Sequence, residues 1–96
     1  MVTPNILEEF KARMRITHSA EDDNLSNLLS SSIADLQAKC GDFNIEENER
    51  AKELVFERTR YVYNDALEYF DDNFLSQINS LAFSILFEEG EENEEV

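Results

Sequence analysis

Apolar residues recur at steps of three and four positions along most of the chain, and this spacing places them on one face of an α-helix. A first helix is predicted to begin at Thr3 and Pro4, because Thr caps helices well and Pro fits the first helical position, and to end near Met14. A second is predicted from Ser19, which begins a capping box, to Gly41, which can adopt a positive φ after the last turn. Its buried face would consist of Leu25, Leu28, Leu29, Ile33, Leu36 and Cys40.

The later part of the chain predicts two more helices. The third is expected from about Glu46 to Phe70, with Asn44 as its cap. Its apolar residues cover more than one side, so neighbouring elements should contact it from several directions. Residues 71–73, two Asp and one Asn, interrupt the pattern and cap a fourth helix. This helix is expected over residues 74–87 and is apolar nearly all round.

The scarcity of turn-forming residues supports long helices. The chain has two Gly and one Pro, too few for the many turns of an all-β domain. We therefore expect an all-α fold, a small bundle of about four helices with two long central helices and an acidic, disordered C-terminal tail. The bundle would occupy residues 1–87 and the tail residues 88–96, where six of the nine residues are Glu. A chain this short buries only about 60–65% of its unfolded surface, so partner subunits should add to its stability.

The charge of the chain excludes some partners. The net charge is −14, and all eight basic residues lie at or before Arg60. Specific binding to nucleic acid or to an anionic membrane requires clustered cations, so neither is expected. No apolar segment has the roughly 18–20 residues that cross a bilayer, and the N-terminus does not resemble a signal peptide. We expect a soluble, intracellular protein whose single cysteine forms no internal disulfide.

The candidates for catalysis or metal binding each have a simpler explanation. His18, the only histidine, lies in a predicted capping turn and is not paired by any sequence signature with Cys40 or a serine. The acids of residues 21–23 fit the first turn of a helix, where they complement the helix dipole, better than a calcium loop. Adjacent acid pairs diverge by about 100° on a helix and do not converge on one substrate atom. We expect no enzyme activity, no cofactor and no metal.

Two predicted surfaces are candidates for contact with other proteins. The first is a ridge of small residues four positions apart on the second helix, which would let another helix approach closely or would simply be a weakly polar exposed face. The second is the fourth helix, where Phe83 and Phe87 would form either an exposed apolar patch or part of the core against the first or third helix. The predicted interface residues are Ser26, Ser30, Ala34, Ala38, Phe74, Ile78, Phe83 and Phe87.

Three stretches of the sequence resemble a known family. They are the run Leu-Glu-Glu-Phe-Lys-Ala-Arg-Met-Arg-Ile-Thr-His at 7–18, the following Ser-Ala-Glu-Asp-Asp-Asn-Leu with its long amphipathic helix ending at Cys40 and Gly41, and the block at 58–70. In this order they resemble the head–tail connector (adaptor, or head-completion) proteins of long-tailed phages and prophages. The resemblance spans residues 3–87, with residues 72–86 in the place of the family's closing helix.

The resemblance implies a structural virion protein. Copies would form a ring, expected to be a dodecamer, between the phage portal protein and a tail-side completion protein. The genomic DNA would pass through this ring without specific binding, and an acidic lumen would repel its phosphates. The protein would be made in the cytoplasm of the bacterial host and would reside at the head–tail junction of the virion.

A second hypothesis belongs to a different class. A small acidic protein can inhibit a DNA-binding protein by presenting carboxylates at the spacing of phosphates. That function would require long regular rows of acids on folded helices, whereas six of the 22 acids here lie in the predicted tail. The connector is therefore the preferred interpretation.

Overall fold

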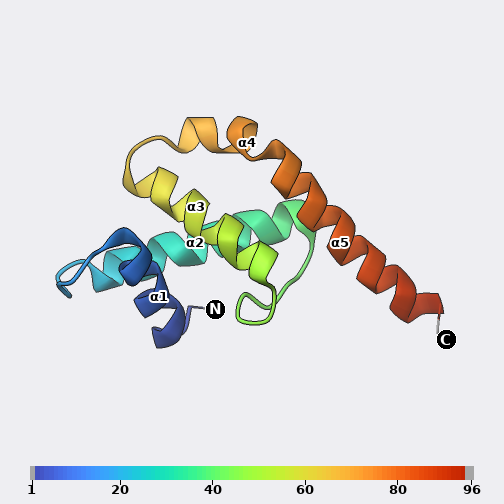
Figure 1. The fold of residues 1–96 in the computed structure, drawn as a ribbon, viewed down its shortest axis with the longest axis horizontal. Helices are drawn as coiled ribbons and strands as arrows, with labels where there is room; N and C mark the ends of the chain where they lie inside the picture. Colours follow the sequence, from blue (N-terminus) through green and yellow to red (C-terminus); the bar gives the residue numbers. More distant parts are fainter. Residues whose placement is uncertain (1, 95–96) are drawn as a thin grey trace.

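The computed structural model describes the backbone of residues 2–94 and the side chains up to residue 88, and it is all-helical over that part of the chain (Figure 1). The elements in order are α1 (Pro4–Met14), α2 (Asp22–Cys40), α3 (Glu49–Tyr63), the short 3₁₀ helix η1 (Leu67–Tyr69), α4 (Phe70–Asn73) and α5 (Leu75–Glu94). The predicted fold class is confirmed.

The body is thin. The Cα atoms extend over 49 × 28 × 17 Å. Packed helix axes lie 8–10 Å apart, so the shortest dimension accommodates about two layers of helices. Every helix therefore keeps one face toward solvent, and a helix with apolar residues on all sides cannot have all of them covered.

The first helix has the predicted bounds, and the second has the predicted end but not the predicted start. The Thr3 hydroxyl accepts a hydrogen bond from the Ile6 N–H at 3.2 Å and caps α1. The predicted capping box at Ser19 is wrong, because α2 begins at Asp22 without any side-chain cap, and only the backbone carbonyl of Ser19 accepts from Asp22. At the other end, Gly41 has the expected positive φ, at 103°.

The third helix is shorter than predicted at both ends. It begins at Glu49, because Asn48 rather than Asn44 supplies the cap, its Oδ1 accepting from the N–H of Ala51 at 3.0 Å. It ends at Tyr63, and the chain reverses through Asp65, whose φ is 57°. Asp is one of the few residues besides Gly that adopts this left-handed conformation readily. The segment predicted as the last turns of this helix forms η1 and the start of α4 instead.

The break after α3 lets the chain bury a cluster of aromatic side chains. Phe70 is fully buried and stacks on Phe74 with ring centroids 5.1 Å apart. The ring of Tyr61 meets both edge-on, at 5.7 Å from Phe70 and 5.6 Å from Phe74. A straight continuation of α3 would carry Phe70 away from the body, so burial of this side chain favours the turn.

The core lies where α2 is covered by the other helices. Its buried apolar residues are Ile6, Phe10, Leu25, Leu29, Ile33, Leu36, Cys40, Ile45, Ala51, Leu54, Val55, Phe56, Phe70, Ile78, Leu81 and Ile85. The last helix contacts α2 and α3, and its C-terminal end extends away from the other helices (Figure 1). The predicted disordered tail, 88–96, falls on residues whose side chains, from 89 on, lie outside the described part of the chain.

Candidate assembly interface

The most exposed apolar surface lies on α5. Phe83, Leu86 and Phe87 are 71%, 63% and 67% exposed, and we call these three residues the α5 flank. Ile78, Leu81 and Ile85 project from the opposite side of the same helix into the core. The flank is uncovered because the thin body can seal only one side of a helix that is apolar nearly all round. Of the two arrangements that the sequence left open for Phe83 and Phe87, the structure has the exposed one.

A groove runs beside the flank, between the start of α3 and α5. It has a volume of about 650 Å³ and is lined by Arg50, Ser80, Phe83, Ser84, Leu86, Phe87 and Glu88. Arg50 is exposed, and its guanidinium donates a long hydrogen bond of 3.5 Å to the backbone carbonyl of Ser80. The apolar flank is therefore bordered by a positive charge.

A second apolar surface was missed by sequence reasoning. Leu67 and Tyr69 in η1 are 41% and 61% exposed, at the turn that joins α3 to α4. The sequence prediction placed both residues within one long helix and therefore gave them no separate role. The signal that marks this corner is the Asn64-Asp65 pair, because Asn and Asp favour turns and tolerate positive φ.

The predicted interface residues do not share one surface. Ser30, Ala34 and Ala38 are exposed and Ser26 is partly buried, so the small-residue ridge faces mainly outward from α2. Phe74 is half-buried in the aromatic group beside Phe70, and Ile78 is part of the chain's own core. The ridge and the α5 flank remain predicted contact surfaces, whereas the chain itself already covers Ile78.

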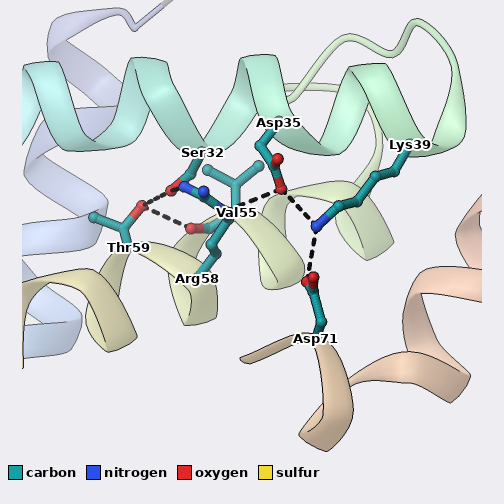
Figure 2. A network of polar contacts seen from close by, with 7 residues as sticks. All are labelled: Ser32, Asp35, Lys39, Val55, Arg58, Thr59 and Asp71. Carbon is teal, nitrogen blue, oxygen red and sulfur yellow. Dashed lines mark hydrogen bonds and ion pairs between the residues drawn. The ribbon is translucent and has the colours of Figure 1, made fainter. Parts of the chain in front are cut away.

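Polar contacts fix the positions of α2, α3 and α4 (Figure 2). The hydroxyls of Ser32 and Thr59, both fully buried, lie 3.0 Å apart, and Thr59 donates to the carbonyl of Val55 at 2.8 Å. Arg58 donates to the Ser32 hydroxyl at 3.1 Å. Both of these buried hydroxyls therefore have a partner, which removes the penalty of burying a polar group and ties α2 to α3.

A chain of charged groups extends this contact to the corner. Arg58 contacts Asp35 at 3.1 Å, and Lys39 lies 2.8 Å from Asp35 and 2.7 Å from Asp71 in α4 (Figure 2). Burial lowers the pKa of Lys39, but hydrogen bonds to Asp35 and Asp71 outweigh it and leave this pKa raised. Lys39 is therefore held in its charged form between α2 and α4, next to the corner that carries Leu67 and Tyr69.

Most cations are paired within the chain. Within the described part, the cations with a carboxylate partner are Lys11, Arg13, Lys39, Lys52, Arg58 and Arg60. Arg15 and Arg50 have no such partner among the described residues. The described carboxylates without a cation are Glu8, Asp23, Asp42, Glu46, Glu47, Asp65, Glu68, Asp72 and Glu88. The outer surface is consequently negative.

The residues considered for catalysis are far apart. His18 is exposed before the start of α2, with its Nε2 3.9 Å from a carboxylate oxygen of Glu21. Cys40 lies at the other end of this 19-residue helix, which is about 27 Å long at 1.5 Å per residue. Its thiol is buried against the carbonyl of Ile78, and burial raises the pKa of Cys40, which disfavours the reactive thiolate. Among the described residues, no three His, Cys, Asp or Glu side chains converge as metal ligands do.

Fold and surface together define a small helical protein with exposed apolar patches on a negatively charged body. Residues 4–95 match the model of the family described as phage gp6-like head-tail connector protein, and the chain belongs to this family. The family match confirms the resemblance drawn from the sequence and assigns the chain a structural, portal-associated role in the virion, at the junction of head and tail. No curated protein and no solved structure matches the chain. Each helix within residues 2–94 is too short or too polar to cross a bilayer.

Proposed function

We propose that copies of this chain assemble into a closed ring beneath the portal, dock on a tail-side completion protein, and form part of the channel through which DNA passes. The observation that carries this proposal is the α5 flank: three large apolar side chains remain exposed although the chain has already formed a core. Contiguous apolar patches of this kind mark protein interfaces. The family match supplies the context in which such an interface would be used.

Burial of the flank would favour assembly. Complete burial of one Phe or Leu side chain stabilises by about 1.5–3 kcal/mol. The three residues of the flank are more than 60% exposed, so a partner that covered them would gain several kcal/mol per subunit. A ring repeats this contact once per subunit, and the loss of the flank should therefore be fatal to the whole assembly.

The charge distribution supports a DNA channel. Because most cations are paired with carboxylates of the same chain, few remain to bind phosphates, and binding of DNA requires such cations. A lumen lined by the remaining carboxylates would repel DNA and let it slide. In this proposal the protein acts by geometry and charge rather than by catalysis, consistent with a buried Cys40 and an isolated, exposed His18.

The alternative of a DNA-mimicking inhibitor has weaker support. Several of its carboxylates, such as Asp22, Asp35 and Asp71, are paired with cations of the chain itself and are not free to imitate a row of phosphates. The family to which the chain belongs also favours the connector.

The test is assembly of a double variant with its cognate portal. Phe83→Glu with Phe87→Glu places two charges on the flank, and we expect electron microscopy to show no ring on the portal. The matched control, Asn5→Glu with Ala12→Glu, adds the same charge at exposed positions of α1 and should assemble normally. Both variants should keep the helical circular dichroism of the parent. Rings of normal yield from the flank variant would refute the proposed role of the flank.

A further inference from the structure

The chain carries two exposed apolar surfaces, one beside an unpaired cation and one with unpaired carboxylates only. The α5 surface consists of the α5 flank with Arg50, a cation without a carboxylate partner among the described residues, and Glu88, an exposed carboxylate on the same groove. The corner surface consists of Leu67, Glu68, Tyr69 and Asp72 on η1 and α4, where both carboxylates are exposed and unpaired. One surface therefore has a cation that can receive a carboxylate, next to one carboxylate of its own, and the other is apolar with negative charges only.

Arg50 is ready for an external carboxylate. Its hydrogen bond to the Ser80 carbonyl is long, at 3.5 Å, and leaves the other N–H groups of the guanidinium toward solvent and the groove. A guanidinium can bind a carboxylate through two parallel hydrogen bonds, which fixes the orientation of the partner as well as attracting it. On a chain of net charge −14, this exposed cation beside the α5 flank indicates a partner surface that is both apolar and acidic.

The corner surface has this composition and is held in place. Asp71, between the two free acids in sequence, contacts Lys39 at 2.7 Å, and Phe70 anchors the same helix in the core. The backbone that carries Leu67 and Tyr69 is therefore already ordered. Binding to an ordered surface loses less conformational entropy.

We infer that the α5 surface of one copy docks on the corner surface of the next copy, with Arg50 facing Glu68 and Asp72. The inference deepens the ring proposed above and rests on it. The two surfaces are different patches of one molecule, so each copy can use both at once, and a head-to-tail contact of this kind closes into a ring when its rotation closes. Phe83 and Phe87 lie about 12–18 Å along α5 from Leu75, where the corner ends, so the two contacts do not compete for the same residues.

Cysteine cross-linking distinguishes this contact from a symmetric one. Leu67→Cys and Phe87→Cys are made as separate full-length proteins, mixed, assembled with the cognate portal and oxidised. We expect a disulfide between the two different variants and none within either variant alone. The parent chain is the control, because its Cys40 is buried and should not cross-link.

The outcomes separate this inference from the proposed function. Rings without the mixed disulfide would overturn the docking contact and leave the ring intact. The mixed disulfide without rings would support the contact and refute the ring. A disulfide that forms within one variant alone would show that two identical surfaces meet each other. This result would overturn the proposed contact. Neither rings nor disulfides would refute both.

Charge reversal supplies a second, independent measurement. Arg50→Glu should weaken ring assembly about tenfold, because it removes one opposite-charge contact and creates a like-charge one. Adding Glu68→Arg and Asp72→Arg to this variant should restore most of the lost ring assembly. The control pair Glu8→Arg and Asp23→Arg makes the same charge change at exposed acids elsewhere and should not restore it. Equal rescue by both pairs would show only a net-charge effect and would overturn the specific contact.

Discussion

Gly41 is the residue where α2 ends against α5, and replacing it tests how α5 is held. Its φ of 103° and ψ of 171° lie in a region that side chains other than Gly rarely occupy. A Cβ at this position would lie 3.0 Å from Cγ2 of Ile85, closer than ordinary van der Waals contact. Gly41→Ala therefore combines backbone strain with a clash against a core residue of α5.

The expected loss of stability is large for a chain of this size. Strain in such a conformation costs about 1–3 kcal/mol, and overpacking of a methyl group adds about 1 kcal/mol. The sum, about 2–4 kcal/mol, compares with a total stability of about 5–14 kcal/mol for a domain of 96 residues. Urea unfolding followed by circular dichroism should show a lower midpoint with an unchanged slope. The midpoint temperature of thermal unfolding should fall by about 8–30 °C.

A double-mutant cycle separates the two causes. Ile85→Leu removes the Cγ2 branch at nearly constant volume and should cost less than about 1.5 kcal/mol alone. If the clash contributes, Gly41→Ala should cost about 1 kcal/mol less in the Ile85→Leu background, while the cost of backbone strain remains. Ile85→Val keeps Cγ2 and serves as the control, because the clash with a Cβ at position 41 remains. A Gly41→Ala variant within about 0.5 kcal/mol of the parent would refute the assigned conformation and contact.

Two further predictions concern buried polar groups. Thr59→Val should lower the free energy of unfolding, measured in urea, by about 1–3 kcal/mol, because the buried Ser32 hydroxyl loses a partner. The control Thr17→Val, at an exposed position, should lower it by less than about 0.5 kcal/mol. Equal losses in the two variants would show that the buried hydrogen bonds do not explain the effect. Burial raises the pKa of Cys40 above its ordinary 9.0, so its thiol stays protonated in the fold after it ionises in the unfolded chain. Stability should therefore fall as pH rises from 9 through the folded pKa, and less steeply in Cys40→Ala; identical slopes in the two proteins would contradict this account.

The sequence predicted the parts of the fold that local rules govern. The start of α1 and the end of α2 lie where they were predicted, because Thr3, Pro4 and Gly41 act on their immediate neighbours. The buried face of α2 follows from helical spacing at five of its six predicted residues, as Leu25 and Leu29 show, whereas Leu28 is only partly buried. The exposure of Phe83 and Phe87 was one of two open alternatives, because the hydrophobicity of a helix does not reveal how many of its sides the fold can cover.

The sequence predictions were wrong where contacts between distant residues determine the backbone conformation. Residues 64–70 continue the helical pattern of α3, and the burial of Phe70 against Tyr61 is the interaction that favours a turn at Asp65. This contact depends on tertiary packing, which overrides local propensity. The corner surface could not be predicted for the same reason, since Leu67 and Tyr69 become exposed only when the helix breaks.

The same charge distribution bears on when the subunits associate. Cations such as Lys11, Lys52 and Arg58 neutralise carboxylates of their own chain, so approaching copies meet mainly as negative bodies. Repulsion acts over about 8 Å at physiological salt, whereas apolar contact at the α5 flank acts only on touching. Free subunits should therefore associate weakly, and more strongly as salt screens the repulsion. A portal that holds several copies side by side would overcome this barrier, because it raises their effective concentration and leaves the short-range contacts to close the proposed ring.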